Sequence, residues 1–436
     1  MANTIGIRRE DKSEWERRVP ITPRDAADLR QAGVDIIVQT SPIRAFDDEE
    51  FSAAGIPVQR ELAACPVILG IKEMPQEIFE PGKAYVFFAH VIKGQPYNMD
   101  MLRRLLELGC TLIDYERIVD DQNRRLIFFG WHAGVAGMIN TLWALGQRLA
   151  WEGIPNPLDR LRQTRTYRDL DEARIGLTEA RARIETEGLP AAVTPLVIGV
   201  AGYGNVSRGA QEMLDLLPTI EIDPREVPAL VSSGEYSRHH VYKAVFHERH
   251  LVEPVEPGAV FHLQDYYDHP EKYRGVFESY LPYLNVVVNA IFWTERYPRL
   301  VTKEGLKALF AGPGPRLRVI GDISCDVEGA IEATVKATEP GDPLYVYDPR
   351  DGSVADGHEG RGVVIMAVDI LPSELPREAS ADFSRVLKPY IPALARCDLA
   401  APLQDLDLPP EIKRAVIAHQ GHLAPDYEYI HQYLDE

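Results

Sequence analysis

The sequence predicts an α/β protein with two domains, one of them a doubly wound domain of the Rossmann type. Short apolar runs of strand length alternate with helical patterns, which is typical of parallel α/β sheets. A glycine turn between an apolar run and a helix begins only near residue 200. The 436 residues are also many for one hydrophobic core. The glycine-turn domain is therefore expected in the middle of the chain, with a different domain before it.

The composition excludes several classes of partner. Hydrophobic residues make up 45% of the chain and charged residues 26%, as in ordinary globular proteins. The formal net charge of −19 argues against nucleic acid or an anionic membrane, because both favour basic surfaces. No apolar run approaches the roughly 18 residues that span a membrane, and the charged start MANTIGIRRED lacks a signal-peptide core. Four cysteines without CxxC spacing predict free thiols in a reducing cytoplasm and no metal site.

The first third of the chain alternates between strands and helices. Pro23 suits a first helical turn and Gly33 suits a helix end, which predicts a helix over 23–33. The other expected elements are strands at 4–9, 35–39, within 61–73, at 83–90 and at 111–116, and a helix at 97–109.

The rest of the chain continues this alternation with two exceptions. A long helix is expected from near Ala133, rich in small residues that allow close approach to its backbone, and a polar insertion at 155–191 contains an amphipathic helix near 171–186. Further strands are expected at 196–200, 285–293, 317–324 and 362–369, with turns and a hairpin at 336–360. The tail from Pro372 is proline-rich and then helical, and is expected to return to the first domain. The expected domains are therefore 1–135 with 372–436, and 136–371.

The glycine turn follows the strand 196–200 and reads GYGNVS. Gly202, Gly204 and Ser207 occupy the three positions of the G-x-G-x-x-G dinucleotide fingerprint, with serine in place of the third glycine. The first glycine permits the tight turn, the second lets the backbone approach a pyrophosphate, and a small third residue allows close packing. The helix that starts at Asn205 and Val206 offers free N–H groups to phosphates. The motif predicts a dinucleotide site.

The choice between NAD and NADP stays open at this point. The fingerprint requires an acid about 20 residues after the turn for the ribose 2′-hydroxyl, and Glu221 and Asp223 fall in that window. Arg225 stands beside them and Arg208 follows the glycine turn, and either could hold a 2′-phosphate.

Charged residues follow four apolar or strand-like segments of the first domain. Because ligands collect beyond the carboxyl ends of strands in open α/β sheets, these residues are candidate site residues. A Lys and His pair beside a nicotinamide is what proton transfer during carbonyl or imine reduction needs, and arginines grip carboxylates. The candidates are Arg17, Arg18, Lys72, Glu73, His90, Glu116, Arg124 and Arg125.

Two further strand ends of the second domain carry polar side chains. Asn289 and Trp293 follow the strand within 285–293, and Asp322 ends the strand within 317–324. Either end could meet the nicotinamide ribose, and Trp293 fits a core position equally well.

Together these segments resemble the lysine–ketoglutarate reductase half of the bifunctional aminoadipic semialdehyde synthases, which is a saccharopine dehydrogenase (NADP, L-lysine-forming) activity. More distantly, the chain is similar to alanine dehydrogenase and to the fungal saccharopine dehydrogenases. The resemblance runs almost end to end and rests on RREDKSEWERRVPITP, ILGIKE, FFAHVIKGQ, LIDYERIVD, FGWHAGVAGMIN, GYGNVSRGAQ, NAIFWTERYPRLVT, GDISCDVEGAIEAT and VDILPSELPREAS.

The resemblance implies a fold, a reaction and roles for the residues. It implies a split α/β substrate domain around the nucleotide-binding domain, and the reductive condensation of L-lysine with 2-oxoglutarate to saccharopine. It favours NADP(H), with NAD(H) possible, and a monomer or homodimer. Lys72 and His90 would transfer protons, Arg18 and Arg125 would bind the carboxylates of 2-oxoglutarate, and Glu116 would face the amino-acid amine.

Glu73 would pair with Lys72 and tune its pKa. The two-residue period of a strand, however, points these neighbours to opposite faces unless the strand ends there. Lys72 is accordingly expected at the carboxyl edge of its sheet, facing the nicotinamide.

Two other functions remain compatible with the sequence. One is an oxidative deaminase of the alanine dehydrogenase kind, which would use pyruvate and ammonia. The other is a module that senses a dinucleotide or lysine without catalysis.

Overall fold

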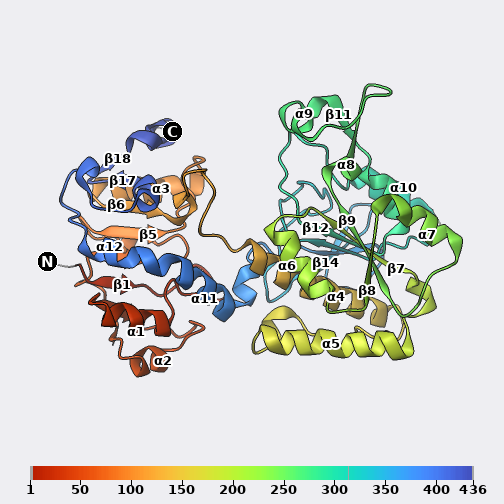
Figure 1. Cartoon of the computed structure of the whole chain (residues 1–436), viewed down its shortest axis with the longest axis horizontal. Helices are drawn as coiled ribbons and strands as arrows, with labels where there is room; N and C mark the ends of the chain where they lie inside the picture. The colour runs from red at the N-terminus through yellow and green to blue at the C-terminus, as the bar shows by residue number, and fades with distance from the viewer. Residues whose placement is uncertain (1–2, 313, 435–436) are drawn as a thin grey trace. The chain divides into compact units, whose positions relative to one another are not determined.

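The computed structural model of the protein describes residues 3–312 and 314–434. The chain folds into two compact units, both visible in Figure 1. Unit 1 comprises Met1–Phe129 and Pro376–Glu436, and unit 2 comprises Gly130–Leu375. The chain therefore leaves unit 1 once and returns to it, at points a few residues from the boundaries expected at 135/136 and 371/372.

Unit 1 is built on an eight-stranded sheet in the order β18-β17-β6-β5-β4-β1-β2-β3. Its strands from β6 to β3 are parallel, whereas β17 is antiparallel to β6 and β18 to β17. The strands are β1 Ile5–Ile7, β2 Ile36–Gln39, β3 Val58–Gln59, β4 Val67–Leu69, β5 Ala84–Phe87, β6 Thr111–Asp114, β17 Val416–His419 and β18 His422–Leu423. The helices are α1 Pro23–Gln31, α2 Asp48–Ala53, α3 Pro96–Glu107, α11 Pro376–Leu387, α12 Ile391–Arg396, α13 Pro410–Arg414 and α14 His431–Leu434.

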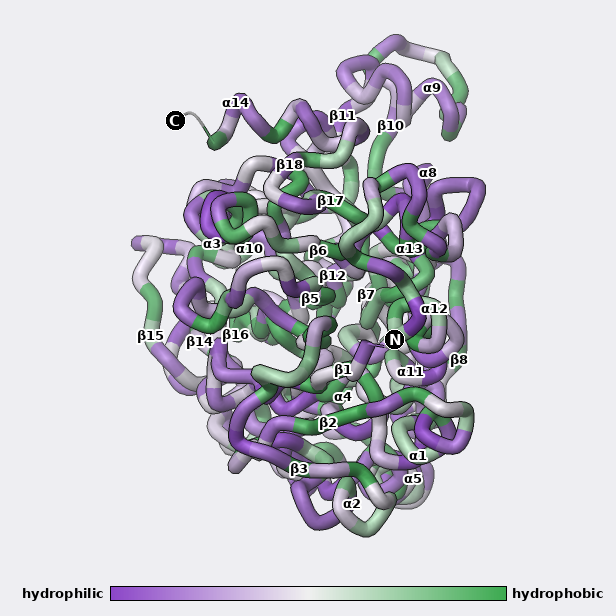
Figure 2. The backbone as a smooth tube through the Cα atoms, turned by 90° about the vertical axis from the view of Figure 1, so that its left-hand side faces the viewer, coloured by the Kyte–Doolittle hydropathy of each residue, from purple (hydrophilic) through white to green (hydrophobic). Residues whose placement is uncertain are grey.

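Local sequence signals explain where these elements begin and end. Helix α1 starts at Pro23 after Thr22, whose side chain accepts a hydrogen bond from the N–H of Asp25, and it stops before Gly33, which has a φ of +85°. Every residue of β1, β4, β5 and β6 is buried, as expected for parallel strands covered on both faces. Figure 2 shows the result as apolar segments within the molecule and polar segments along its outer turns.

The tail after Pro372 contains the predicted helices but also a strand that the sequence reading did not predict. Helices α11 and α12 return to unit 1, and β17 then adds to the sheet beside β6. All four residues of β17 are buried. A four-residue apolar run is too short to be distinguished from a helical segment by its pattern alone, so its pairing with β6 decides its conformation.

Unit 2 is built on a second eight-stranded sheet in the order β15-β14-β16-β13-β12-β7-β9-β8. The strands from β8 to β16 are parallel, and β14 and β15 form the antiparallel hairpin expected at 336–360. The strands are β7 Leu196–Ala201, β8 Thr219–Ile222, β9 Val241–Phe246, β12 Val286–Asn289, β13 Val319–Asp322, β14 Leu344–Tyr347, β15 Val354–Asp356 and β16 Val363–Met366. A separate two-stranded sheet pairs β10 Val252–Pro254 with β11 Tyr273–Gly275.

Helices cover both faces of the sheet of unit 2. One apolar core joins the sheet to α4 Gly130–Trp151, α5 Leu170–Glu187 and α6 Asn205–Leu214. The other core joins it to α7 Val227–Ser233, α8 Glu248–Leu251, α9 Leu263–Asp268 and α10 Lys303–Ala311. Both the long helix near 133 and the amphipathic helix near 171–186 are confirmed. The unit is doubly wound, as predicted.

The small residues of α4 allow α6 to lie directly against it. A Cβ atom added to Gly134 would stand 1.8 Å from the carbonyl oxygen of Val206, and one added to Gly209 would stand 2.1 Å from that of Trp131. No side chain fits at either position. This contact fixes the N-terminal end of α6, which follows the glycine turn.

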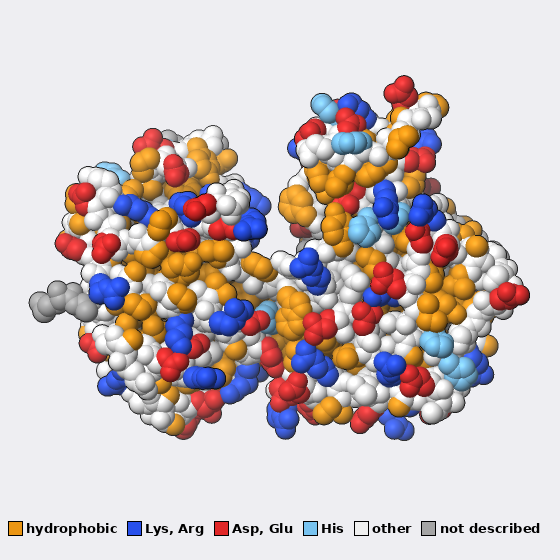
Figure 3. Space-filling view, viewed as in Figure 1, with side chains coloured by type: hydrophobic (Ala, Val, Ile, Leu, Met, Phe, Trp, Pro, Cys, Tyr) orange, Lys and Arg blue, Asp and Glu red, His pale blue; other side chains and the backbone are white. Residues whose placement is uncertain are grey.

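Residues 3–312 and 314–434 contain neither a membrane-spanning helix nor a cluster of metal ligands. None of the helices there is both long and apolar enough to cross a membrane. Within the same residues, no group of three or more His, Cys, Asp and Glu side chains could hold a metal ion. Acidic and basic side chains are interspersed over the face of the molecule drawn in Figure 3.

Candidate active-site residues and the dinucleotide turn

The charged residues predicted for the first domain gather at one edge of the sheet of unit 1. Strands β6, β5, β4 and β1 are neighbours and parallel, so their carboxyl ends share one edge. Lys72 and Glu73 follow β4, His90 follows β5, Glu116 follows β6, and Arg18 lies in the segment after β1. These candidate residues therefore follow strands whose carboxyl ends share one edge of the sheet, and the roles of the residues remain predictions.

Lys72 is held through its backbone by a buried glutamate. One carboxylate oxygen of Glu10 accepts the N–H of Ile71 at 2.7 Å and the other accepts the N–H of Lys72 at 3.0 Å. Burial, with help from the charge of Glu16, raises the pKa of Glu10 to about 7. Burial and then the charge of Arg18 lower the pKa of Lys72 below its usual value. The neutral amine of Lys72 is therefore easier to form than that of an exposed lysine.

Arg18 forms a buried ion pair with Glu16. Its Nε donates to Oε1 of Glu16 at 2.7 Å and its Nη2 donates to Oε2, and both side chains are 3% exposed. The guanidinium also lies over the ring of Phe129, 4.3 Å from its centre. Burial alone would raise the pKa of Glu16, but the charge and hydrogen bonds of Arg18 lower it overall. The pair is charged and held rigidly.

Glu73 pairs with His90 and Lys12 rather than with Lys72. Its Oε1 lies 2.6 Å from Nδ1 of His90, and its Oε2 accepts from Nζ of Lys12 at 2.6 Å. Burial would raise the pKa of Glu73, but the hydrogen bonds of His90 and Lys12 hold it well below its usual range. Both carboxylate oxygens are engaged, which corrects the expected pairing of Glu73 with Lys72. An ionised Glu73 accepts the proton of Nδ1, so Nε2 of His90 is left for a ligand.

The backbone at His90 is held in an uncommon conformation. His90 has a φ of +49°, in the left-handed region that non-glycine residues seldom adopt. The buried amide of Asn98 on α3 donates to the carbonyl oxygens of Ala89 at 3.0 Å and of His90 at 3.2 Å. Non-glycine residues in this region cluster at functional sites, where the surrounding structure fixes them.

The end of strand β6 is followed by the ion pair of Arg125 with Glu116, and its last residue is the buried acid Asp114. Nη1 of Arg125 lies 3.4 Å from Oε1 of Glu116, and the side chain of Arg125 is 43% exposed. Asp114, the last residue of β6, is fully buried, and burial raises its pKa to about 7. Arg125 is therefore far more exposed than Arg18, although its guanidinium also lies over the ring of Phe88, 5.9 Å from the ring centre.

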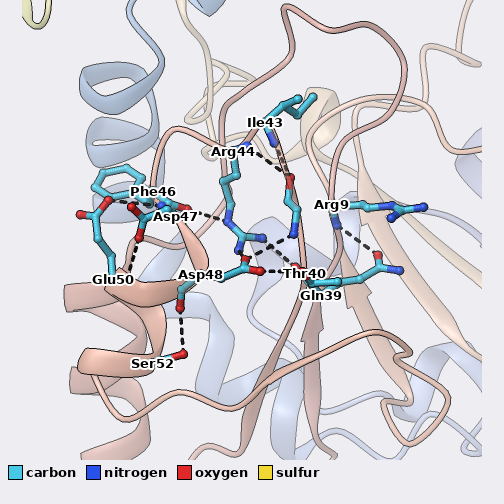
Figure 4. A network of polar contacts seen from close by, with 11 residues as sticks. Arg9, Gln39, Thr40, Ile43, Arg44, Phe46, Asp47, Asp48, Glu50 and Ser52 are labelled. Atoms are coloured by element: carbon cyan, nitrogen blue, oxygen red, sulfur yellow. Dashed lines mark hydrogen bonds and ion pairs between the residues drawn. The ribbon is translucent and has the colours of Figure 1, made fainter.

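Another charged cluster of unit 1 is structural. The guanidinium of Arg44 is buried and donates to the carbonyl oxygens of Phe46 and Gln39 and to the carboxylate of Asp48 (Figure 4). Asp48 also accepts from Thr40 at 2.5 Å. These bonds close the turn between β2 and α2, so this cluster needs no ligand to explain it.

The glycine turn of unit 2 has the shape that the fingerprint requires. Gly202 has a φ of +100°, and a Cβ atom there would stand 2.7 Å from the carbonyl oxygen of Ala290. Gly204 precedes α6 with no side-chain cap, and a Cβ atom there would meet nothing within 4 Å. The hydroxyl of Ser207 donates to the carbonyl of Gly202 at 2.7 Å and is fully buried. These features fit a pyrophosphate at the open N-terminus of α6, which begins with Asn205 and Val206.

A cavity of about 340 Å³ opens at this turn. Its lining includes the glycine turn, Glu248 at the start of α8, the residues after β12 and aromatic side chains of the segment 266–297. Among the lining residues are Gly202, Tyr203, Gly204, Glu248, Tyr266, Tyr267, Ala290, Trp293 and Tyr297. Strands β7 and β12 are adjacent, yet the chain leaves β7 toward β8 and β9 before it reaches β12. The cavity therefore lies where the strand order reverses, which is where α/β sheets bind ligands.

The acids predicted from spacing lie on β8 and directly after it. Strand β8 pairs only with β9 and forms the edge of the sheet, so Glu221 is separated from β7 by a whole strand. Glu221 pairs with Lys243 at 3.0 Å, and Asp223 forms a two-point pair with Arg225. Neither acid, and not Arg225, lines the cavity. The spacing rule assumes that the strand after the first helix pairs with the first strand, whereas here β9 stands between β7 and β8, and the roles of these three residues stay predictions.

The polar residues that end β12 and β13 interact with each other. Asn289 donates to the carboxylate of Asp322 at 2.8 Å, and Thr334 donates to its other oxygen. Asn289 and Asp322 are each 1% exposed, and burial raises the pKa of Asp322 to about 6. Trp293 lines the cavity, and its indole N–H donates to the carbonyls of Tyr297 and Pro298.

Sequence reading missed Glu10, Lys12, Glu16 and Asp114. The first three lie in the charged segment after β1, where charge density alone does not show which side chain turns inward. The position of Asp114 at the end of an apolar run is a signal that could have identified it, two residues before Glu116.

Comparisons with known proteins match both the sequence and the fold. The N-terminal domain of alanine dehydrogenase/PNT matches residues 6–136, and the C-terminal domain of the same family matches residues 268–426. The alpha-aminoadipic semialdehyde synthase of Arabidopsis thaliana is 38% identical over 98% of this chain, and the chain spans 41% of that protein. The saccharopine dehydrogenase [NAD(+), L-lysine-forming] of Neurospora crassa is 28% identical over 90% of this chain and 91% of its own length.

A solved L-alanine dehydrogenase shares the fold, with a TM-score of 0.62 at 17% identity over 99% of each chain. The two domain models match more than half of the chain between them, in the same order as in the family. The chain therefore belongs to the alanine dehydrogenase/PNT family.

Proposed function

We propose that the chain catalyses the NAD(P)H-dependent condensation of L-lysine with 2-oxoglutarate to saccharopine, or the reverse. The observation that carries this proposal is the edge of unit 1, where Lys72 and His90 follow neighbouring parallel strands, Arg18 acts on the charge of Lys72 and Arg125 pairs with Glu116. The names of the relatives support it, since they are aminoadipic semialdehyde synthases and saccharopine dehydrogenases. The chain spans less than half of the aminoadipic semialdehyde synthase of Arabidopsis thaliana, so the proposal does not extend to the whole activity of that protein.

In the proposed reaction the ε-amine of lysine attacks the keto carbon of 2-oxoglutarate, and the carbinolamine loses water to give an imine. A bound reduced nicotinamide supplies the hydride that reduces this imine. The amine must be neutral to attack, and the departing hydroxyl must be protonated. Lys72 and His90 make these transfers, as base and acid or in the opposite assignment.

The surroundings of the two residues support these roles. The lowered pKa of Lys72 favours its neutral form, which can accept a proton. Glu73 holds Nδ1 of His90, which directs Nε2 to exchange a proton with substrate. Arg125 and Arg18 bind the carboxylates of 2-oxoglutarate, and Glu116 faces the amine of lysine.

The glycine turn with Gly202, Gly204 and Ser207 holds the dinucleotide. The resemblance favours NADP(H), and NAD(H) is possible; the choice depends on the residues that meet the adenosine ribose. The proposal includes a cytoplasmic protein that is a monomer or homodimer. The four cysteines support a reducing compartment, since all of them are free thiols.

An NAD(P)H oxidation assay tests the proposal. Lysine with 2-oxoglutarate is compared with pyruvate and ammonia, each with both cofactors. Oxidation that requires lysine and 2-oxoglutarate together supports it. Oxidation with pyruvate and ammonia alone supports an alanine dehydrogenase activity, and cofactor binding without oxidation by any pair supports a sensing module.

A further inference from the structure

An acid follows β9, the strand that pairs with β7 in the sheet of unit 2. Strand β9 is parallel to β7, with Phe246 opposite Ala201, and the N–H of Gly202 donates to the carbonyl of Phe246. The end of β9 is therefore beside the glycine turn. In dinucleotide sites the acid that binds the ribose lies at the end of the strand next to the first strand. Here the acid at that place is Glu248, the second residue after β9.

Glu248 is positioned by contacts to the turn and to the wall of the cavity. Its Oε1 accepts from the hydroxyl of Tyr203 at 3.2 Å and from the hydroxyl of Tyr267 at 2.7 Å. Tyr203 stands between the two glycines of the turn, and its ring stacks on His247 at 4.4 Å. Glu248 lines the same cavity as Gly202 and Gly204. The carboxylate thus lies at the cavity wall, where both hydroxyls bind the same one of its two oxygens.

From this geometry we infer that Glu248 makes the site specific for NAD(H) over NADP(H), by accepting a hydrogen bond from the 2′-hydroxyl of the adenosine ribose. The inference rests on the proposed dinucleotide function. A 2′-phosphate would bring close to two negative charges to the same carboxylate and has no hydroxyl to donate.

Two cations near Glu248, Arg299 and Arg249, are engaged with other groups. Arg299 is the one Lys or Arg among the described residues that line the cavity. Its guanidinium is held by the carbonyls of Gly329 and Glu328 and by the carboxylate of Glu332. Arg249 follows Glu248 but donates to the ring of His250 and is not part of the lining.

Fluorescence titration of the intact chain with NADH and with NADPH tests the inference, without lysine or 2-oxoglutarate. The unaltered protein is expected to bind NADH about 10- to 100-fold more tightly than NADPH, the range of one hydrogen bond to a charged group. Glu248→Gln is expected to weaken NADH binding by about tenfold and to reduce the preference. Glu221→Gln, the same change at the acid expected from spacing, is expected to leave the preference unaltered.

Equal or tighter binding of NADPH by the unaltered protein would overturn the inference. So would an unaltered preference in Glu248→Gln, or a lost preference in Glu221→Gln. If Glu248→Gln does not fold, the unaltered protein and Tyr267→Phe, which removes one donor to Glu248, still decide it. A clear preference for NADH in a protein that does not turn over lysine with 2-oxoglutarate would leave the inference standing and reject the proposed reaction.

Discussion

The carboxyl edges of the two sheets differ in the chemistry that they present. The edge of unit 1 presents ionisable side chains that hold one another, as in the Arg18–Glu16 and Glu73–His90 pairs. The edge of unit 2 presents backbone and apolar surface around a glycine turn, with Glu248 as the acid of its cavity lining. The same strand geometry therefore carries paired charges in one unit and a glycine turn with an open helix N-terminus in the other. The difference lies in the residues that follow each strand.

The largest expected effect is a difference in the free energy of unfolding between variants of Arg18 and Arg125 in unit 1. Arg18→Ala is expected to lower the free energy of unfolding by about 3–5 kcal/mol, because it leaves Glu16 buried without its partner. Arg125→Ala is expected to cost less than about 1 kcal/mol, because its pair is exposed and long, and instead to raise the KM for 2-oxoglutarate. Chemical denaturation of both variants beside the unaltered protein checks this. Equal losses of stability would show that the burial of the Arg18 pair does not matter.

The next effect concerns proton transfer. Lys72→Met is expected to lower kcat for lysine with 2-oxoglutarate by about 10² or more, in line with the contribution of a general acid or base. Lys307→Met, the same change at an exposed residue of α10, serves as the control and is expected to leave kcat unaltered. Turnover of Lys72→Met near that of the control would reject the assignment.

A smaller effect is expected on dinucleotide binding, and variants of the two glycines of the turn in unit 2 should differ in stability. Gly204→Ala is expected to weaken dinucleotide binding by about tenfold while leaving the melting temperature unaltered, because its Cβ atom enters the space expected for the pyrophosphate and meets no protein atom. Gly202→Ala is expected to lower stability as well, by about 1–3 kcal/mol, because of its φ of +100°. Calorimetry and NADH titration of both variants check the difference. A melting temperature lowered equally in both variants would contradict it.

The smallest effect concerns pH. The pKa of Glu10 is raised from 4.5 to about 7, so the native state holds this proton more tightly than the unfolded chain. Its contribution to stability is complete below pH 4.5 and is lost as the pH rises through 7.

Glu10→Gln is expected to flatten the fall in the free energy of unfolding between these two pH values, by on the order of 1 kcal/mol. Thermal unfolding at a series of pH values measures this. Glu77→Gln, an exposed change in the same unit, is the control. Identical pH profiles for Glu10→Gln and the control would show that Glu10 is not buried as a neutral acid.

Much of the candidate site could be predicted because its signals are local. Lys72, His90 and Glu116 each follow an apolar run, and parallel strands place their carboxyl ends at one edge whatever their order. Glu10 and Glu16 could not be assigned in this way, because they reach the site only through the pairing of β1 with β4. The partner of Glu73 could not be predicted either, since neighbours in sequence point apart at a strand end and His90 comes from the next strand.

The sequence by itself determined the α/β class, the glycine turn and the edge that carries the charged residues, because each follows from hydrophobic period, glycine spacing and residue type over a few positions. Only the tertiary structure decided which charges pair and which acid lies beside the glycine turn. Those depend on strand order, and strand order is set by packing between segments distant in sequence. Strand β9 stands between β7 and β8, and this one difference in order places Glu248 beside the turn and Glu221 away from it.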